Sequence, residues 1–95
     1  MARHVRRFRF ETEVPTEDLE AAVFVSVLAA EAIHGRAAVR LNGRFSVDPD
    51  GRQIRCHTES DAGKSIASVF TVLASQMFGE DSFVIEEDES DHVTV

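Results

Sequence analysis

The residue types that most often carry chemistry, histidine and cysteine, are few and scattered in this chain. Histidines stand at positions 4, 34, 57 and 92, and the single cysteine, Cys56, directly precedes His57. No two histidines have the His-x-x-x-His spacing of a helical metal site. Neighbouring strand residues point to opposite faces of a sheet, so we expect Cys56 and His57 neither to share a metal ion nor to act as nucleophile and base. The sequence therefore predicts no catalytic residue, no metal site and no cofactor.

Two short motifs are similar to functional ones but have structural explanations. Gly63-Lys64-Ser65 matches the end of a phosphate-binding P-loop, yet Thr58 stands where that motif requires its first glycine. The carboxylates of Glu17, Asp18 and Glu20 cluster near the expected start of a helix, where acidic residues complement the helix dipole. Neither motif predicts a phosphate-binding or acid–base site.

Length and composition predict one small domain. The 95 residues are 43% hydrophobic, which is enough for one core, and a single cysteine excludes an internal disulfide framework. The first residues contain no apolar run that could serve as a signal peptide, and the uncharged stretch 21–30 is about half the length of a membrane span. We therefore expect a cytoplasmic protein without a membrane segment.

Hydrophobic periodicity predicts the secondary structure. Alternation of Phe8, Phe10, Thr12 and Val14 with charged residues is typical of a strand, and Thr16 is a helix-capping residue type. Val39, Leu41, Phe45 and Val47 alternate in the same way before a turn over 48–51. In order, the patterns predict a strand over 7–14, a helix over 16–34, a hairpin of strands over 39–47 and 52–58, a helix that ends at Gly79 and a strand over 82–86.

This order predicts an α+β fold of the βαββαβ type. The economical arrangement is a two-layer sandwich, in which a four-stranded antiparallel sheet is covered on one face by both helices, in an HPr-like or a ferredoxin-like topology. The domain would span residues 1–86. Residues 87–95 are acidic and have too few apolar side chains to order a segment, so we expect a disordered tail.

The open face of this sheet is one candidate surface. It would carry five arginines as candidate anion-binding residues: Arg7, Arg9, Arg40, Arg44 and Arg55. They could bind an anionic ligand, or they could form cross-strand ion pairs on solvated strands. RNA-recognition folds stack bases on aromatic residues of this face, but here the phenylalanines are expected to be inward or helical, and Tyr and Trp are absent. With a net charge of −7, a nucleic-acid partner is disfavoured.

The first predicted helix offers a second surface, because it is apolar nearly all round. Beside its core stripe it has a further apolar set, Phe24, Val25, Leu28 and Ala32. A helix of a two-layer domain normally presents one polar side to water. The surplus predicts close helix–helix packing or a protein interface, including a homodimer.

The segment Lys64-Ser65-Ile66-Ala67-Ser68-Val69-Phe70-Thr71-Val72-Leu73 resembles the regulatory-serine region of the HPr phosphocarrier proteins of the sugar phosphotransferase system. The resemblance implies an open-faced β-sandwich, a regulatory phosphorylation site at Ser65, and partner docking through Ile66, Ala67 and Phe70. HPr proteins carry a phosphorylated His in a His-x-Arg-Pro signature at the start of the first helix. This chain has Thr16-Glu17-Asp18-Leu19-Glu20 there, with neither His nor Arg.

Taken together, these patterns predict a non-catalytic, HPr-like regulatory or protein-interaction module that acts through its helical face and is neither an enzyme nor a working phosphocarrier. Its partner would be another protein or a second copy of itself. The alternative is a ferredoxin-like domain that binds an anionic ligand or nucleic acid on the arginine-bearing sheet. A structural alternative also remains open, in which Ser65 only caps a helix and Ile66 and Phe70 are core residues.

Overall fold

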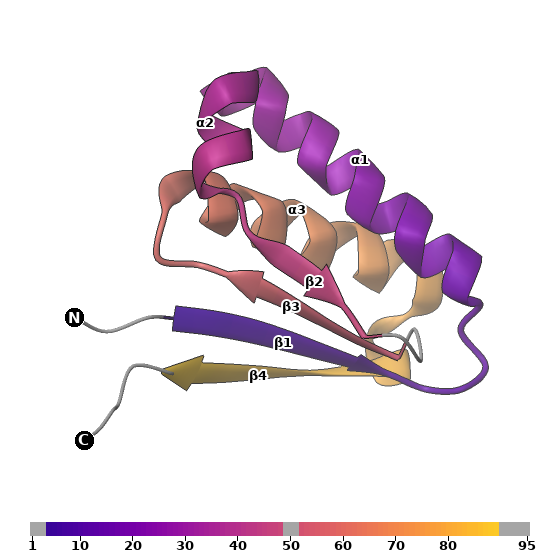
Figure 1. Ribbon diagram of the computed structural model, residues 1–95. Helices are drawn as coiled ribbons and strands as arrows, with labels where there is room; N and C mark the ends of the chain where they lie inside the picture. The colour runs from indigo at the N-terminus through magenta and orange to yellow at the C-terminus, as the bar shows by residue number, and fades with distance from the viewer. Residues whose placement is uncertain (1–3, 49–51, 90–95) are drawn as a thin grey trace.

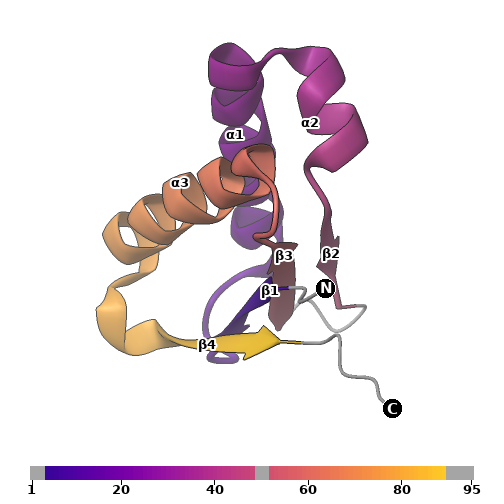
Figure 2. The same cartoon turned by 90° about the vertical axis from the view of Figure 1, so that its left-hand side faces the viewer.

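The computed structural model of the chain describes residues 4–48 and 52–89 (Figure 1). Within these ranges the elements are β1 (His4–Phe10), α1 (Thr16–His34), α2 (Arg36–Asn42), β2 (Phe45–Val47), β3 (Gln53–His57), α3 (Asp61–Phe78), the 3₁₀ turn η1 (Glu80–Ser82) and β4 (Phe83–Glu89). The helices lie together on one side of the strands (Figure 2). The predicted α+β sandwich is therefore confirmed, with one more helix than the sequence patterns predict.

The sheet has the strand order β2-β3-β1-β4, and all neighbours are antiparallel. The central strand β1 places Phe8 opposite Ile54 of β3 and opposite Ile85 of β4. Each helical connection joins two strands that have one other strand between them, which is the split βαβ arrangement of ferredoxin-like domains. Of the two topologies expected from the sequence, the strand order is thus the ferredoxin-like one.

The additional helix, α2, occupies residues predicted to begin a strand. Only Val39 of this segment is buried, whereas Leu41 is 72% exposed, so the two residues do not share an inward sheet face. The sequence Arg-Ala-Ala-Val-Arg-Leu contains mostly strong helix formers, which outweigh two alternating apolar positions. Gly35 adopts φ 89° and ψ 151°, a conformation almost confined to glycine, and turns the chain from α1 into α2.

The start of α1 also differs from the prediction. β1 ends at Phe10 instead of Val14, and Thr12 is exposed in the turn that follows. Thr16 is the first helical residue and so does not occupy the N-cap, and its hydroxyl accepts a hydrogen bond from Arg52 Nη2 at 3.3 Å. Pro15 occupies the N-cap, with its φ fixed at −66° by the ring, and it offers no side-chain hydrogen bond to the helix.

The last strand extends beyond the predicted domain boundary at residue 86. β4 runs to Glu89, because its backbone pairs with the full length of β1, with Arg6 opposite Glu87 and His4 opposite Glu89. Residues 87–89 therefore belong to the sheet and not to a disordered tail. The remaining predicted tail, 90–95, and positions 49–51 of the predicted turn lie outside the described residues.

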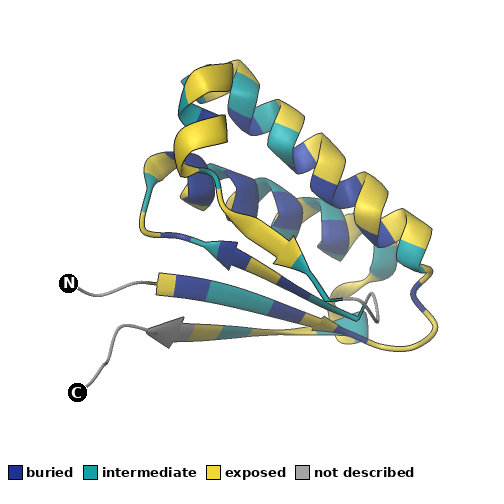
Figure 3. Cartoon of the chain, viewed as in Figure 1, coloured by how far each residue is buried: buried dark blue, intermediate teal, exposed yellow. Residues whose placement is uncertain are grey.

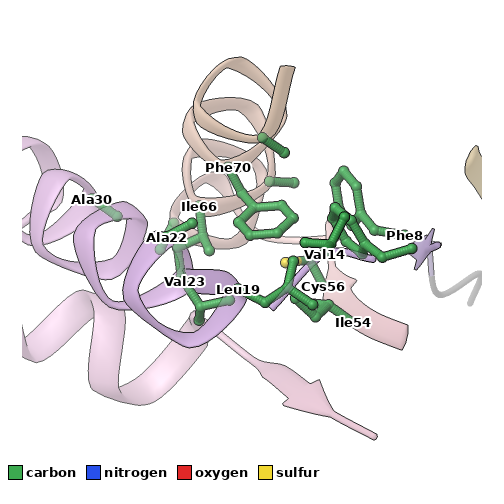
Figure 4. Packing of buried hydrophobic residues seen from close by; sticks show 14 of the residues in the cluster. Phe8, Val14, Leu19, Ala22, Val23, Ala30, Ile54, Cys56, Ile66 and Phe70 are labelled. Atoms are coloured by element: carbon green, nitrogen blue, oxygen red, sulfur yellow. The ribbon is translucent and has the colours of Figure 1, made fainter. Parts of the chain in front are cut away.

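The core lies between the inner face of the sheet and the helices (Figure 3). Phe8, Leu19, Ile54, Ile66 and Phe70 are its largest fully buried apolar side chains. They converge from β1, β3, α1 and α3 (Figure 4). The rings of Phe8 and Phe70 meet edge to face with centroids 4.8 Å apart, a favourable geometry for aromatic pairs. In the described part of the chain, no helix has the length and apolar character to cross a membrane.

Candidate functional site

The outward side of α1 is unusually apolar. Leu19, Ala22 and Val23 on its inner side are buried in the core. On the opposite side Phe24 is 63% exposed and Leu28 is 48% exposed, one helical turn apart. The second apolar set seen in the sequence therefore meets water, and the core does not use its two largest members.

A shallow apolar hollow of about 260 Å³ lies between α1 and the sheet edge. From α1 its lining consists of Glu20, Val23, Phe24 and Val27, and from β2 it consists of Phe45 and Val47. Glu20 is its one charged residue. We call these six residues, together with Leu28 beside them, the α1–β2 surface.

The strand that borders this surface, β2, is an edge strand. On the β3 side, His57 N–H donates to the carbonyl of Arg44 at 2.9 Å, and Asp48 N–H donates to the carbonyl of Gln53 at 2.8 Å. Hydrogen-bonded and non-hydrogen-bonded positions alternate along antiparallel strands. The backbone N–H and C=O groups of Phe45 and Val47 therefore point away from β3, toward the open edge. Sequence periodicity did not locate this feature, because it depends on which strand ends the sheet.

The docking residues implied by the HPr resemblance are not on the surface. Ile66, Ala67 and Phe70 are at most 1% exposed and pack into the core. They form the face of α3 that meets β1, β3 and α1, so no partner can reach them in the folded domain. This expectation is therefore wrong for all three residues, and the reading of Ile66 and Phe70 as core residues is confirmed.

Ser65 lies in the second turn of α3 and does not cap it. The cap is Ser60, whose Oγ accepts a hydrogen bond from Gly63 N–H at 3.0 Å. Ser65 Oγ lies 2.7 Å from His34 Nε2, at the last residue of α1. The two residues are 31 positions apart, so no sequence motif indicated the contact. Neither lines the α1–β2 surface, and their contact ties the end of α1 to α3.

The arginines of the open sheet face are partly neutralised. Glu86 of β4 forms ion pairs with Arg7 at 3.2 Å and with Arg9 at 3.0 Å. Arg55 is opposite Arg7 in the register and is exposed, and Arg44 precedes β2. For Arg7 and Arg9, this geometry favours cross-strand ion pairs over an anion site.

Arg40 does not belong to the sheet face. It lies on α2 and is exposed there, because residues 36–42 are helical. The predicted five-arginine surface is therefore wrong at this position.

Cys56 and His57 face opposite sides of β3, as predicted. Cys56 lies in the core at 2% exposure, and burial raises the pKa of its thiol from 9.0 to about 12, against a smaller lowering by the charge of Arg6. His57 Nδ1 lies 3.8 Å from Glu59 Oε1. Among the residues that the structure describes, no three His, Cys, Asp or Glu side chains are grouped to hold a metal ion.

In comparisons with known proteins, no family model matches the chain, and no curated protein is significantly similar to it.

Proposed function

We propose that this protein is a non-catalytic protein-interaction module that binds its partner through the α1–β2 surface. The exposure of Phe24 and Leu28, on a helix whose other side already fills the core, is the observation that carries the proposal. Large apolar side chains grouped beside a hollow are typical of protein interfaces. The partner is a protein, and the module works in the cytoplasm.

The HPr resemblance adds a regulatory role to the proposal. Ser65 remains the candidate phosphorylation site, and its contact with His34 supplies a physical consequence. A phosphate on Ser65 would add close to two negative charges at the junction of α1 and α3. Phosphorylation would thus alter the helix pair that presents Phe24 and Leu28.

Anion binding on the sheet is the weaker alternative. On the central strand of the sheet, Arg7 and Arg9 both form ion pairs with the carboxylate of Glu86. An anion that binds these arginines would have to displace this carboxylate or lie close to it. Repulsion by that carboxylate disfavours a phosphate or a nucleic acid backbone at this position.

The proposal is tested by comparing complexes formed by the wild-type chain with those of Phe24→Glu and Leu28→Glu. A charge placed on the apolar surface should abolish capture of the partner, or change the oligomeric state, while the circular dichroism spectrum stays native. Val72→Glu is the matched control, because Val72 is 56% exposed on α3 and outside the α1–β2 surface. Equal capture by all four proteins, each folded, would exclude the proposal.

A further inference from the structure

We propose that the partner of the α1–β2 surface is a second copy of this chain, joined edge to edge through β2 so that two sheets become one. This inference rests on the proposed function and names its partner. It follows from the self-complementarity of three features of β2: its backbone groups, its apolar side and its charges.

The backbone groups of β2 are arranged for two-fold pairing. Phe45 and Val47 direct their N–H and C=O groups outward, and Ser46 lies between them. In an antiparallel pair centred on Ser46, Phe45 of one copy is opposite Val47 of the other. Both residues then occupy hydrogen-bonded positions, so the two-fold axis generates four new main-chain hydrogen bonds.

The same register brings the apolar sides together. Phe45 and Val47 both face the hollow beside α1, and Phe24 stands exposed across that hollow. In a dimer with a two-fold axis at Ser46, the apolar lining of the hollow in one copy would contact the same lining in the second copy. Burial of Phe24 and Phe45 in a dimer accounts for large side chains that a monomer leaves in water.

The charges that flank β2 are complementary under the same operation. Arg44 precedes the strand and Asp48 follows it. Pairing centred on Ser46 sets Arg44 of one copy opposite Asp48 of the other, twice in the dimer. In the described structure, neither Arg44 nor Asp48 has an ion-pair partner within 4.0 Å, so both charges are available. Opposite charges in directly paired positions stabilise an antiparallel register, whereas like charges would oppose it.

The opposite edge of the sheet lacks this self-complementarity. Along β4 the carboxylates of Glu86 and Glu87 bind Arg7, Arg9 and Arg6 of their own chain. Two β4 strands paired edge to edge would bring acidic segments together, and the repulsion disfavours that dimer. The β2 edge is therefore the one that we assign to self-association.

Sedimentation equilibrium of the full chain over a concentration series tests this inference. We expect a monomer–dimer equilibrium that Val47→Pro shifts to monomer, since proline removes the outward N–H of Val47 and leaves the hydrogen bonds to β3 in place. Val84→Glu, at an exposed apolar residue of β4, is the matched control and should dimerise like the wild type.

A charge exchange tests the register even if Val47→Pro unfolds. Arg44→Asp or Asp48→Arg alone should raise the dimer Kd about tenfold, because each places two like-charged pairs across the axis. The double variant Arg44→Asp/Asp48→Arg should restore Kd to within about threefold of the wild-type value.

Two outcomes would overturn the inference: a wild-type chain that stays monomeric at millimolar concentration, or a dimer that the double variant does not restore. If the chain is monomeric while Phe24→Glu still abolishes capture of another protein, the proposed function stands and only the identity of the partner is wrong. If Phe24→Glu also has no effect, the proposed function itself fails.

Discussion

Arg52 holds the connection between β1 and α1 in place. Its guanidinium donates hydrogen bonds to the carbonyl oxygens of Glu11 at 2.8 Å and of Val14, and it reaches the hydroxyl of Thr16. These groups lie 36 to 41 positions away in the chain. One side chain thus binds two main-chain acceptors of a turn that is also closed by a hydrogen bond from Val14 N–H to the carbonyl of Glu11 at 3.2 Å.

We expect Arg52→Ala to lower the free energy of unfolding by about 1.5–3 kcal/mol, because hydrogen bonds from a charged donor to two main-chain carbonyls are lost. Urea unfolding followed by circular dichroism measures the change. Arg55→Ala is the control, since Arg55 is exposed and should change stability by no more than about 0.5 kcal/mol. Equal losses in the two variants would contradict this role for Arg52.

Cys56 makes the stability of the folded protein depend on pH in the alkaline range. Its thiol stays protonated in the folded protein until the pH approaches 12, whereas the unfolded thiol ionises above pH 9.0. The unfolded state therefore releases a proton that the folded state keeps, and the Cys56 contribution to stability falls as pH rises from 9 toward 12. The loss should be about 1.4 kcal/mol per pH unit in that window.

The measurement is urea unfolding at pH 8 and pH 10 for the wild type and for Cys56→Ala. The alanine variant is less stable at both values because it leaves a cavity, but it should lose less stability between them. An identical pH dependence in the two proteins would show that the thiol ionises as readily when folded as when unfolded.

At the scale of elements, the packing of α3 against β3 depends on Gly63. A Cβ atom built at this position would lie 1.9 Å from the carbonyl oxygen of His57, which is far inside van der Waals contact. The glycine that made this segment similar to a P-loop is thus required for the close approach of a helix to a strand.

Gly63→Ala should therefore destabilise the domain by at least about 1–3 kcal/mol, the usual cost of overpacking, since backbone atoms must move apart. Ser68→Ala on the same helix is exposed and should be nearly neutral. Thermal unfolding of the two variants compares them directly. A stable Gly63→Ala domain would mean that α3 can shift away from β3 at little cost.

The ends of the helices could be predicted best from the sequence, and the second strand could be predicted least well. Gly35 and Gly79 both adopt positive φ where α1 and α3 end, as their residue type indicates. Val39 and Leu41 satisfied strand alternation by coincidence, since two positions cannot distinguish a period of 2 from one of 3.6. The edge position of β2 and the contact between His34 and Ser65 arise from tertiary packing, which local patterns do not encode.

At the scale of the whole molecule, ion pairs and exposed apolar side chains are spread over several elements. Ion pairs link β1 to β4. The exposed large apolar residues of the described chain lie on all three α-helices and on both edge strands, and four of them, Phe24, Val25, Leu28 and Ile33, lie on α1. The first turn of α1 carries the exposed carboxylates of Glu17 and Asp18. A phosphoryl group approaching that helix end would meet negative charge, which is unfavourable for phosphate binding there.

We accordingly expect no phosphorylation of the chain when it is incubated with phosphoenolpyruvate and the first enzyme of the phosphotransferase system. Intact-mass spectrometry before and after incubation is the measurement, with an HPr protein as the positive control. A mass gain of one phosphate on a histidine would refute the view that this is a module without phosphotransfer activity.

If the outward side of α1 is a binding surface and not part of the core, a single preparation of Phe24→Glu should remain folded and lose binding. Its urea unfolding should give a free energy within about 0.5 kcal/mol of the wild type, as is usual for exposed positions, and the same sample should have lost complex formation. Leu19→Glu, at a fully buried position of the same helix, should instead unfold. A binding role for this side of α1 is contradicted if Phe24→Glu unfolds like Leu19→Glu, or if it stays folded and still forms every complex of the wild type.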